Sequence, residues 1–283
     1  MTLRAEKDAT VSGVAAVEIE IHDLHKSFGD KAVLRGVSLS IRAGDTVAIV
    51  GGSGCGKTVL LNHVLGQLQP DRGYVAVVDH DDPSAPLRRL TDIGELEIDR
   101  IHGHWGVVFQ KNALFSGTVY DNIALWLREM KQMEDADIRP VATHVLGVVG
   151  LRGDDDFLAT DQHELSGGMA KRLAIARALA MSPVVLFYDE PTTGLDPSTS
   201  ARMHDLIQVT HDEILPSGVE RTTVIITHDK DLLTRLRPRT VMLHEGRVFF
   251  DGPFADFAAN ESEIVRPYFD LMPILHERRP PAG

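Results

Sequence analysis

A glycine-rich segment that directly follows a short apolar run constrains this chain more than any other feature. Residues 47–50 are apolar and mostly β-branched, which predicts a buried strand, and apolar residues recur with helical spacing over 60–65. Between these elements, Gly51-x-x-x-x-Gly56-Lys57-Thr58 matches the P-loop pattern. The predicted binding residues for a nucleoside triphosphate are Gly51, Gly52, Ser53, Gly54, Cys55, Gly56, Lys57, Thr58 and Val59.

The residue types in this loop suit phosphate chemistry. Glycines let the backbone turn tightly enough for successive N–H groups to surround an anion, and the positive end of the following helix points at the same place. Lys57 can reach the β- and γ-phosphates, and the Thr58 hydroxyl can ligate Mg²⁺. We therefore favour a triphosphate site over a glycine-rich turn without a ligand. Because Cys55 lies inside the loop, we expect its alkylation to block nucleotide binding and bound nucleotide to protect it.

Length, charge and composition bound the remaining possibilities. A chain of 283 residues forms one large domain or two small ones. Its formal net charge of -12 argues against a nucleic-acid partner for the surface as a whole. No stretch reaches the roughly 20 apolar residues that span a bilayer, the first residues are too charged for a secretory signal, and a single cysteine fits a reducing cytoplasm. We expect the chain to serve a membrane only from the cytosolic side, through a partner.

A second apolar run ends in two carboxylates. Residues 184–188 are apolar over a length too short for a helix, which predicts a central parallel strand, and Asp189 and Glu190 follow directly. An aspartate at the carboxyl end of such a strand can hold the Mg²⁺ shell. The glutamate beside it can orient and deprotonate an attacking water. With a P-loop upstream, a catalytic pair is favoured over two exposed carboxylates at a strand end.

Apolar periodicity predicts the remaining elements. Strands are expected over residues 17–22, 33–41, 74–78 and 223–227, with a turn over 25–29 and a hairpin over 241–249. The pattern is helical from about 118 to 180, and residues 79–82 predict a solvated acidic loop rather than a metal cluster.

Three short segments are the most specific signals in the chain. They are Leu165-Ser166-Gly167-Gly168-Met169, the run from Asp189 to Pro197, and Thr227-His228-Asp229. With the P-loop, they closely resemble the motifs of the ATP-binding subunits of ABC transporters. The resemblance implies an α/β P-loop NTPase fold, with a RecA-like core, an N-terminal antiparallel β subdomain and an inserted helical subdomain.

The resemblance also implies the domain boundaries. It covers residues 17–252, with the helical subdomain at about 113–180. Residues 1–16 are then a flexible leader, and residues 253–283 form a C-terminal extension that is rich in apolar side chains. We expect this extension to pack on the chain's own core, and we keep the hypothesis that part of it clasps a neighbouring subunit.

Two halves of an ATP site follow from the same resemblance. Ser166 and the amides of Gly167 and Gly168 open a predicted helix, which suits a second phosphate site. In the family this site faces the P-loop of another copy, so that a homodimer encloses two ATP molecules.

Other residues match family positions one at a time. Phe28 matches the aromatic residue that stacks on adenine, and Gln110 matches the glutamine that contacts Mg²⁺ and the attacking water. Asp196 matches the loop that crosses the dimer interface, and His228 matches the histidine that contacts the γ-phosphate. Because Glu190 and His228 are both present, the resemblance implies a working ATPase.

Details of the motifs point to one branch of the family. Met169 ends the signature, Val59 follows the P-loop hydroxyl, and residues 111–124 contain an Ala-Leu-Phe, Thr-Val and Asn pattern. These features resemble the ATPases of Mla-type phospholipid systems, whose partners are membrane permeases, MCE-domain proteins and a small accessory subunit. The chain would then sit peripherally on the cytoplasmic face of the inner membrane. The alternatives are an importer or exporter for another substrate, a soluble ABC ATPase of DNA repair or translation, and a regulator that holds ATP without hydrolysing it.

Overall fold

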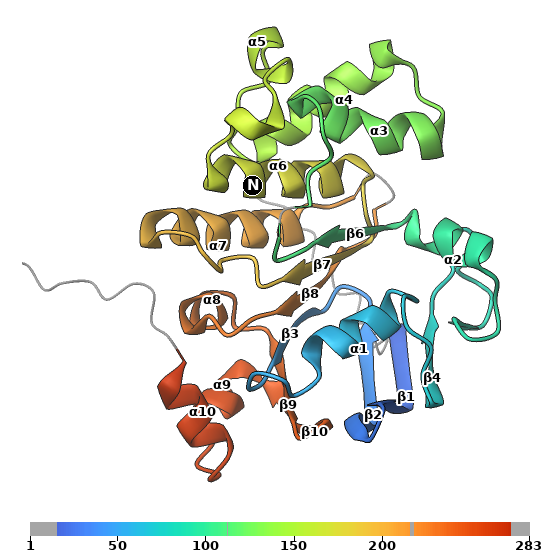
Figure 1. The fold of residues 1–283 in the computed structure, drawn as a ribbon, viewed down its shortest axis with the longest axis vertical. Coiled ribbons are helices and arrows are strands. Elements are labelled where there is room, and N and C mark those ends of the chain that lie inside the picture. The colour runs from blue at the N-terminus through green and yellow to red at the C-terminus, as the bar shows by residue number, and fades with distance from the viewer. Residues whose placement is uncertain (1–15, 112, 216–217, 273–283) are drawn as a thin grey trace, which may run out of the picture.

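Two β-sheets organise the chain (Figure 1). A computed structural model describes residues 16–111, 113–215 and 218–272. One sheet has six strands in the order β10-β9-β3-β8-β7-β6, and the other has four in the order β2-β1-β4-β5. The six strands are β3 (Thr46–Val50), β6 (Trp105–Val108), β7 (Val185–Asp189), β8 (Thr222–Ile226), β9 (Arg239–His244) and β10 (Arg247–Pro253). The four strands are β1 (Val17–Phe28), β2 (Lys31–Arg42), β4 (Arg72–Val77) and β5 (Arg88–Arg89).

Helices surround the larger sheet and form a separate layer above it. In Figure 1, α6 lies between the sheet and the layer formed by α3, α4 and α5. Buried side chains of α3, α4 and α6 share one apolar cluster, which also reaches β6 and β7. The helices are α1 (Lys57–Val64), α2 (Glu95–His102), α3 (Val119–Lys131), α4 (Asp135–Val148), α5 (Asp155–Leu158), the 3-10 helix η1 (Gln162–Glu164), α6 (Gly167–Ala180), α7 (Pro197–Asp212), α8 (Lys230–Leu236), α9 (Phe254–Ala258) and α10 (Val265–Leu271).

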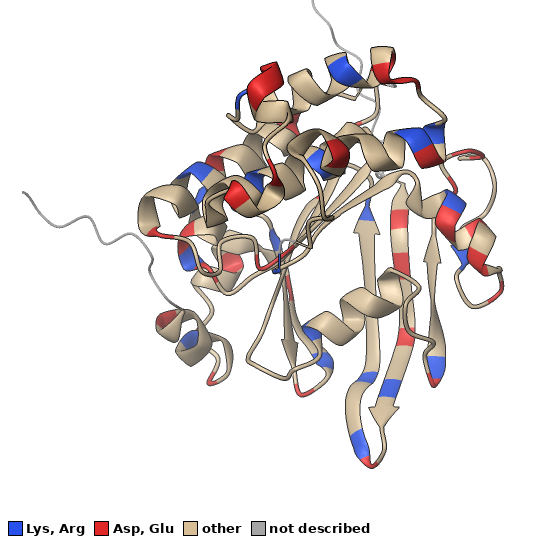
Figure 2. Ribbon diagram, turned by 45° about the horizontal axis from the view of Figure 1, so that its top comes forward, with Lys and Arg blue, Asp and Glu red and all other residues tan. Residues whose placement is uncertain are grey.

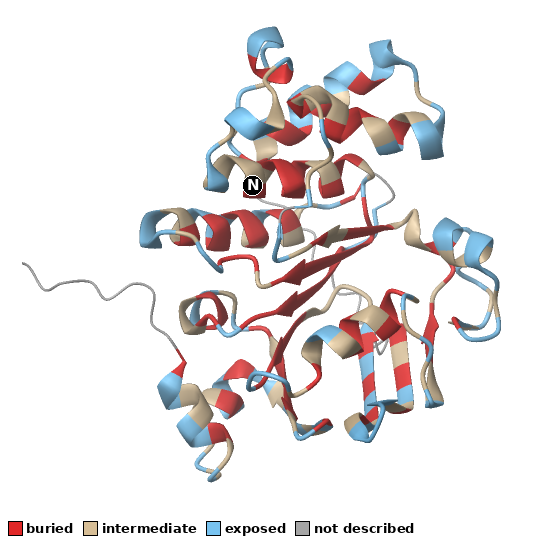
Figure 3. Ribbon diagram, viewed as in Figure 1, coloured by how far each residue is buried: buried red, intermediate tan, exposed pale blue. Residues whose placement is uncertain are grey.

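The central strands explain where the functional loops lie. Every residue of β7 and β8 is buried, as in parallel strands covered on both faces (Figure 3). β3 pairs in parallel with β8, β8 with β7, and β7 with β6. The loops that follow these four strands therefore leave the same edge of the sheet. The α/β fold predicted from the sequence is confirmed, as is the hairpin, formed by β9 and β10.

The antiparallel sheet differs from the prediction in two respects. The turn predicted over residues 25–29 is wrong, because β1 continues to Phe28. The β1–β2 ladder shifts register between Ile21 and Leu24, where Asp23 has a φ of 43°. This bulge lets β1 continue beyond the point where apolar and polar residues stop alternating in the sequence. In addition, β4 and β5 follow α1 in the chain, so segments from both sides of the P-loop build this sheet.

The acidic loop is more structured than predicted. Asp79 is only 5% exposed, so the expectation of a solvated loop is wrong for this residue. Arg100 of α2 donates a hydrogen bond to Asp79, with Nη1 2.9 Å from Oδ1, and this bond lowers the pKa of Asp79. The same guanidinium pairs with Asp81, which contacts His104 Nε2 at 2.9 Å. The loop is thereby tied to α2 and to the residue just before β6.

The surface carries charges of both signs. Figure 2 shows acidic and basic residues interspersed over the outer helices and along the antiparallel strands. Within the described parts of the chain, no helix combines the length and the apolar character that crossing a membrane requires.

The start of the C-terminal extension packs on the six-stranded sheet. Side chains of α9 and α10 join those of β3, β9 and α8 in one cluster. Its buried members are Ala48, Val50, Leu233, Met242, Phe254, Phe257, Val265 and Met272. The extension therefore covers the chain's own core as far as Met272. Residues 1–15 of the expected leader and residues 273–283 lie outside the described residues, and the clasp around a neighbouring subunit stays a prediction.

Candidate nucleotide site

Glycine geometry shapes the loop between β3 and α1. Gly51 has a φ of 146°, and a Cβ there would lie 2.3 Å from the backbone oxygen of Leu243. Gly56 has a φ of 108°, and a Cβ there would lie 2.8 Å from a methyl carbon of Leu34. A side chain at either position would clash with its neighbours and strain the backbone. The loop can take this shape only with glycine at both ends.

The loop leaves hydrogen-bond donors available. Helix α1 has no side-chain cap at Gly56. Within the described residues, the amides of Ser53, Gly54 and Gly56 make no hydrogen bond to the protein. Amides of this kind at a helix N-terminus attract anions. The predicted loop residues thus present their backbone at one place, in agreement with a phosphate cradle.

Lys57 spans the same loop from within. Its Nζ donates to the carbonyl oxygens of Gly51 at 2.7 Å and Gly52 at 3.2 Å, and it lies 4.0 Å from the Sγ of Cys55. Thr58 is exposed in the first turn of α1. Val59 differs, because its side chain packs on the core beneath α1, which leaves its backbone as the part that can face a ligand.

Asp189 ends β7 as a buried carboxylate. It is 9% exposed, and no hydrogen bond or ion pair engages its side chain within the described residues. Burial raises its pKa, the charge of Glu190 raises it further, and Lys57 opposes both. Such a carboxylate is poised for a cation, because ionisation without one is unfavourable.

Glu190 and His228 meet across two neighbouring loops. Glu190 Oε2 lies 2.7 Å from His228 Nδ1, and the hydroxyl of Thr193 lies 3.4 Å from the same oxygen. Glu190 has a φ of 50°, a left-handed conformation that costs a non-glycine residue about 1 to 3 kcal/mol. Its N–H donates to the Ile226 carbonyl at 2.8 Å, which holds the turn. Strain of this kind is typical of positions where a side chain must point in one direction.

A buried lysine, whose role the sequence did not reveal, joins the loops that follow β6 and β7. Lys171 of α6 is 3% exposed, and its Nζ donates to the carbonyls of Gln110, Glu190 and Thr193 at 3.3, 3.4 and 3.5 Å. Burial lowers its pKa, and the nearby charge of Glu190 opposes that shift. The available signal was helical spacing, because Lys171 shares a face with the buried Ile175.

A second missed residue supports His228. Asp229 is 2% exposed and accepts hydrogen bonds from His204 Nε2 and the Thr192 hydroxyl, both at 2.8 Å. It also caps α8 by accepting from the amides of Asp231 and Leu232. Burial pushes the pKa of Asp229 up, but the hydrogen bond from His204 and the other donors outweigh it, so that the pKa is lowered. The exposed His228 therefore stands on a fixed turn.

The remaining predicted residues lie at other points of the molecule. Ser166 caps α6 by accepting from the Met169 amide at 3.3 Å, and a Cβ on Gly168 would lie 3.1 Å from a carbon of Thr199 in α7. Gly167, next to Ser166, is exposed. Asp196 caps α7 by accepting from the Ser198 and Thr199 amides, and Thr199 is the residue that lies against Gly168.

Hydrogen bonds from the Thr199 and Ser198 side chains hold the pKa of Asp196 well below its usual range. Phe28, at the end of β1, is 49% exposed. The side chain of Gln110, after β6, is also exposed.

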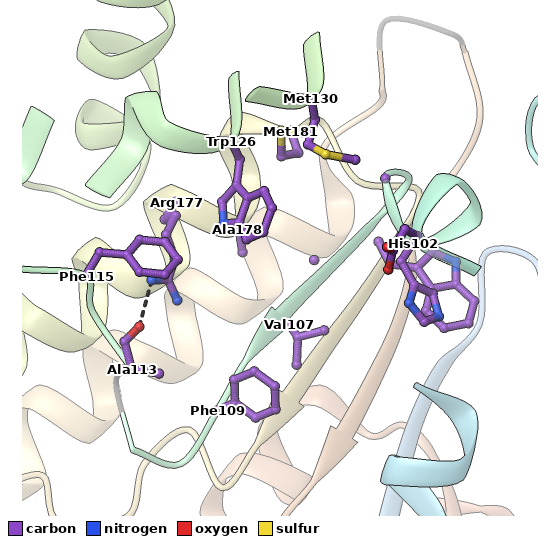
Figure 4. Close-up of a pocket in the computed structure, with 14 residues that line it drawn as sticks. His102, Val107, Phe109, Ala113, Phe115, Trp126, Met130, Arg177, Ala178 and Met181 are labelled. Carbon is purple, nitrogen blue, oxygen red and sulfur yellow. Dashed lines mark hydrogen bonds between the residues drawn. The ribbon is translucent and has the colours of Figure 1, made fainter. Parts of the chain in front are cut away.

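A pocket of about 460 Å³ opens beside the loop that follows Gln110 (Figure 4). Val107 and Phe109 line it from the β6 side, Phe115 lines it from the loop beside α6, and Trp126 and Met130 line it from α3. Arg177 of α6 donates to the Ala113 carbonyl at 2.8 Å and lies 4.8 Å from the centre of the Phe115 ring. The pocket thus joins the sheet, the loop and the helical layer.

Comparison with known sequences gives consistent relatives. The model of the ABC transporter family matches residues 34–193. The chain is 35% identical to the chloroplastic protein TRIGALACTOSYLDIACYLGLYCEROL 3 of Arabidopsis thaliana, over 93% of this chain and 76% of that protein. It is 33% identical to the probable ribonucleotide transport ATP-binding protein mkl of Mycobacterium tuberculosis, over 90% of this chain and 67% of that protein.

Solved structures give the same result. CbiO1 of Clostridium perfringens, part of the ABC transporter complex cbiONQ, superposes with a TM-score of 0.72 at 31% identity, over 89% of this chain and 94% of that one. The ATP-binding cassette MJ0796, solved as a post-hydrolysis dimer with ADP and Pi, gives a TM-score of 0.70 at 28% identity, over 83% of this chain and 98% of that one.

Proposed function

Because this chain belongs to the ATP-binding subunits of ABC transporters, and is therefore an ATPase, we propose that it drives a membrane transporter by hydrolysing ATP between two copies of itself. The observation that carries the proposal is the 2.7 Å contact between His228 and Glu190, beside the unpaired carboxylate of Asp189. Residues 17–252 form the ATPase domain in this proposal, with the helical subdomain at about 113–180, after a leader over 1–16 and before an extension over 253–283.

The P-loop holds the phosphates of ATP in this proposal. The loop amides that have no described partner, those of Ser53, Gly54 and Gly56, face the phosphates. The Lys57 ammonium, which now bonds the Gly51 and Gly52 carbonyls, turns to the β- and γ-phosphates. Phe28, half exposed at the end of β1, offers a ring face to adenine. Glu190 then orients the attacking water and accepts its proton, while His228 fixes Glu190 and contacts the γ-phosphate.

The residues at this edge also fit Mg²⁺. Oxygen ligands from an acid, a hydroxyl and an amide suit this ion, and the buried Asp189 lacks any other partner among the described residues. Thr58, Gln110 and Asp189 would hold Mg²⁺, which would neutralise the charge that develops in phosphoryl transfer.

A homodimer supplies the other half of each site. Ser166, Gly167, Gly168 and Asp196 lie on α6 and α7, and no described contact joins them to the P-loop of the same chain. Exposed amides at the start of α6 suit a γ-phosphate bound by another copy. The dimeric cassette MJ0796 with ADP and Pi supports this arrangement.

A membrane permease is the second partner that we propose. The pocket beside the Gln110 loop is lined mainly by apolar side chains, of which Trp126 and Met130 are 43% and 45% exposed. A short helix of a permease, with apolar side chains, would fit there and could move the loop that carries Gln110. CbiO1, a relative by structure, is part of a transporter complex. The chain would then lie peripherally on the cytoplasmic face of the inner membrane.

We propose phospholipid as the cargo, in a system with an MCE-domain protein and a small accessory subunit. The support is the motif pattern around Met169 and residues 111–124, together with a plant relative whose name contains a glycolipid. The mycobacterial relative is named for ribonucleotide transport, so an importer or exporter for another substrate is the alternative. The neighbouring genes separate the two, since a permease gene beside an MCE-domain gene favours lipid and its absence favours the alternative.

Glu190→Gln tests the proposed mechanism. The amide keeps the size of the side chain but cannot accept a proton, so we expect kcat to fall about 100-fold or more. ATP should remain bound, and size-exclusion chromatography with Mg·ATP should show a stable dimer. Glu261→Gln, at an exposed position of the extension, is the matched control. Fast turnover in the Glu190 variant, or a variant that stays monomeric with ATP, would reject the assignment.

Co-purification with membranes separates a transporter from a soluble ABC ATPase.

A further inference from the structure

Helix α10 of the C-terminal extension reaches the first residue of the P-loop. The Tyr268 hydroxyl accepts a hydrogen bond from the Gly51 N–H at 2.9 Å and donates to the Gly51 carbonyl at 3.4 Å. The two residues are 217 positions apart in the sequence. A single hydroxyl therefore engages both polar groups of a buried glycine on which the loop depends.

The next residue of α10 reaches the helix that follows β8. The Phe269 carbonyl accepts from Lys230 Nζ at 3.2 Å, and the same Nζ lies 4.0 Å from the centre of the Phe269 ring. Lys230 begins α8, two positions after His228. Adjacent residues of one short helix thus touch the loop after β3 and the helix after β8.

Helix α10 is itself held on the core. The Phe269 ring packs against the rings of Phe254 and Phe257, at centroid distances of 6.2 and 5.8 Å, and Val265 is fully buried. Tyr268 is thereby presented to Gly51 by a fixed surface. Burial raises the pKa of Tyr268 to about 12, so its hydroxyl keeps the proton that it donates throughout the neutral range.

Gly51 needs such a partner. Its φ of 146° and its close approach to the Leu243 carbonyl leave little room for rearrangement. Its carbonyl also accepts the 2.7 Å hydrogen bond from Lys57. Without the Tyr268 hydroxyl, the Gly51 amide would be a buried donor without an acceptor, and the loop would gain by leaving this conformation.

We propose that Tyr268 is a positioning residue of the ATP site, whose hydroxyl fixes the Gly51 peptide and so holds the P-loop ready for phosphate. This inference rests on the proposed role of the P-loop, and it gives the C-terminal extension a part in nucleotide binding. Tyr268 acts on the loop before ATP binds. Its loss should therefore weaken binding more than it slows the chemical step.

Tyr268→Phe is the direct test, because it removes one oxygen and keeps the packing ring. We expect KM for Mg·ATP to rise about 5- to 10-fold, as for a lost hydrogen bond to a buried group, with kcat changed less than about 2-fold. Hydrogen exchange of the Gly51 amide in nucleotide-free protein should become faster. Leu271→Ala, on the same helix and 84% exposed, is the control and should match wild type in both measurements.

Unchanged KM and unchanged Gly51 exchange in Tyr268→Phe would overturn the proposal. A merely structural role for Tyr268 predicts a lower unfolding temperature with wild-type KM, and this result would overturn it as well. If Tyr268→Phe does not fold, Lys230→Met loosens the same helix and should raise KM in the same direction, and an unchanged KM there counts against the proposal. Lys57→Ala distinguishes failure of the proposed P-loop site from failure of the proposed role of Tyr268. If Lys57→Ala binds ATP as well as wild type does, the proposed P-loop site is refuted. If Lys57→Ala loses ATP binding while Tyr268→Phe keeps the wild-type KM, only the role of Tyr268 is refuted.

Discussion

Asp189 and Glu190 are adjacent carboxylates with unlike surroundings. Glu190 is turned towards His228 by a left-handed backbone and has a partner 2.7 Å away. Asp189 points into the buried edge of the sheet, where burial and then the charge of Glu190 raise its pKa. The two carboxylates have different roles in the proposed mechanism, because Glu190 accepts a proton and Asp189 helps to bind a cation.

Asp189→Asn should stabilise the nucleotide-free protein while it abolishes hydrolysis. Because the pKa of Asp189 is raised in the folded state, its ionisation destabilises the folded state at every pH above 3.8, the pKa in the unfolded chain. This cost grows with pH until the pH passes the raised pKa. The isosteric amide removes this cost. We expect the free energy of unfolding to rise by about 1 kcal/mol at pH 7, a common gain when a residue retained for function is replaced. The gain should shrink as the pH falls towards 3.8.

Thermal unfolding without nucleotide at several pH values measures this effect. Asp30→Asn, in the exposed turn between β1 and β2, is the control and should leave the unfolding temperature unchanged. A destabilised Asp189→Asn at pH 7 would contradict the account of this site.

The sequence predicted the functional roles that depend on a few consecutive residues. Glycine spacing specifies the P-loop, and two carboxylates after an apolar run specify the end of β7, because both depend on local backbone geometry. Lys171, Asp229 and Tyr268 act through partners that are 19 to 217 positions away, and no local pattern encodes these pairings. The sequence also could not show that β4 and β5 complete a sheet begun before the P-loop.

At the scale of elements, the end of the loop between β6 and α3 is tied to the first turns of α3 by side-chain hydrogen bonds. Thr118 and Asp121 form a capping box at the start of α3. Asn122 is fully buried, accepts from the Phe115 amide at 2.8 Å and donates to the Phe115 carbonyl at 2.9 Å. Asn112 lies outside the described residues. The asparagine in the sequence pattern that suggested an Mla-type ATPase thus has a structural purpose, since it ties the loop to α3.

Asn122→Ala should release this end of the loop. The variant removes a fully buried side chain and leaves two backbone groups of the half-buried Phe115 without partners, so we expect the free energy of unfolding to fall by about 2 kcal/mol. Thr118→Ala removes only the helix cap and should cost about 1 kcal/mol. Urea unfolding of both variants measures the difference. Equal losses in the two variants would mean that Asn122 adds nothing beyond the cap.

At the scale of the molecule, the two surfaces that we propose to bind phosphate lie on different parts of one chain. The P-loop follows β3, whereas Ser166 and Asp196 cap α6 and α7. No described hydrogen bond, ion pair or ring contact joins the two sets within the chain. A closed site then requires two copies with two-fold symmetry, in which the same pair of surfaces meets twice. Within one chain the P-loop already has its glycine-dependent shape, with Tyr268 bonded to Gly51, so each copy would bring a preformed half.

Mixing two inactive variants tests this composition of the site. Lys57→Ala damages the P-loop half, and Ser166→Arg damages the signature half, so each homodimer should be inactive. A mixed dimer contains one site with both defects and one site with neither. If the sites act independently, random mixing of equal amounts makes half of the dimers mixed and should restore roughly a quarter of wild-type ATP hydrolysis. Phosphate release from the mixture, measured against each variant alone, decides the matter. Recovery cannot arise if both halves of a site come from one chain, because each chain then carries a damaged site.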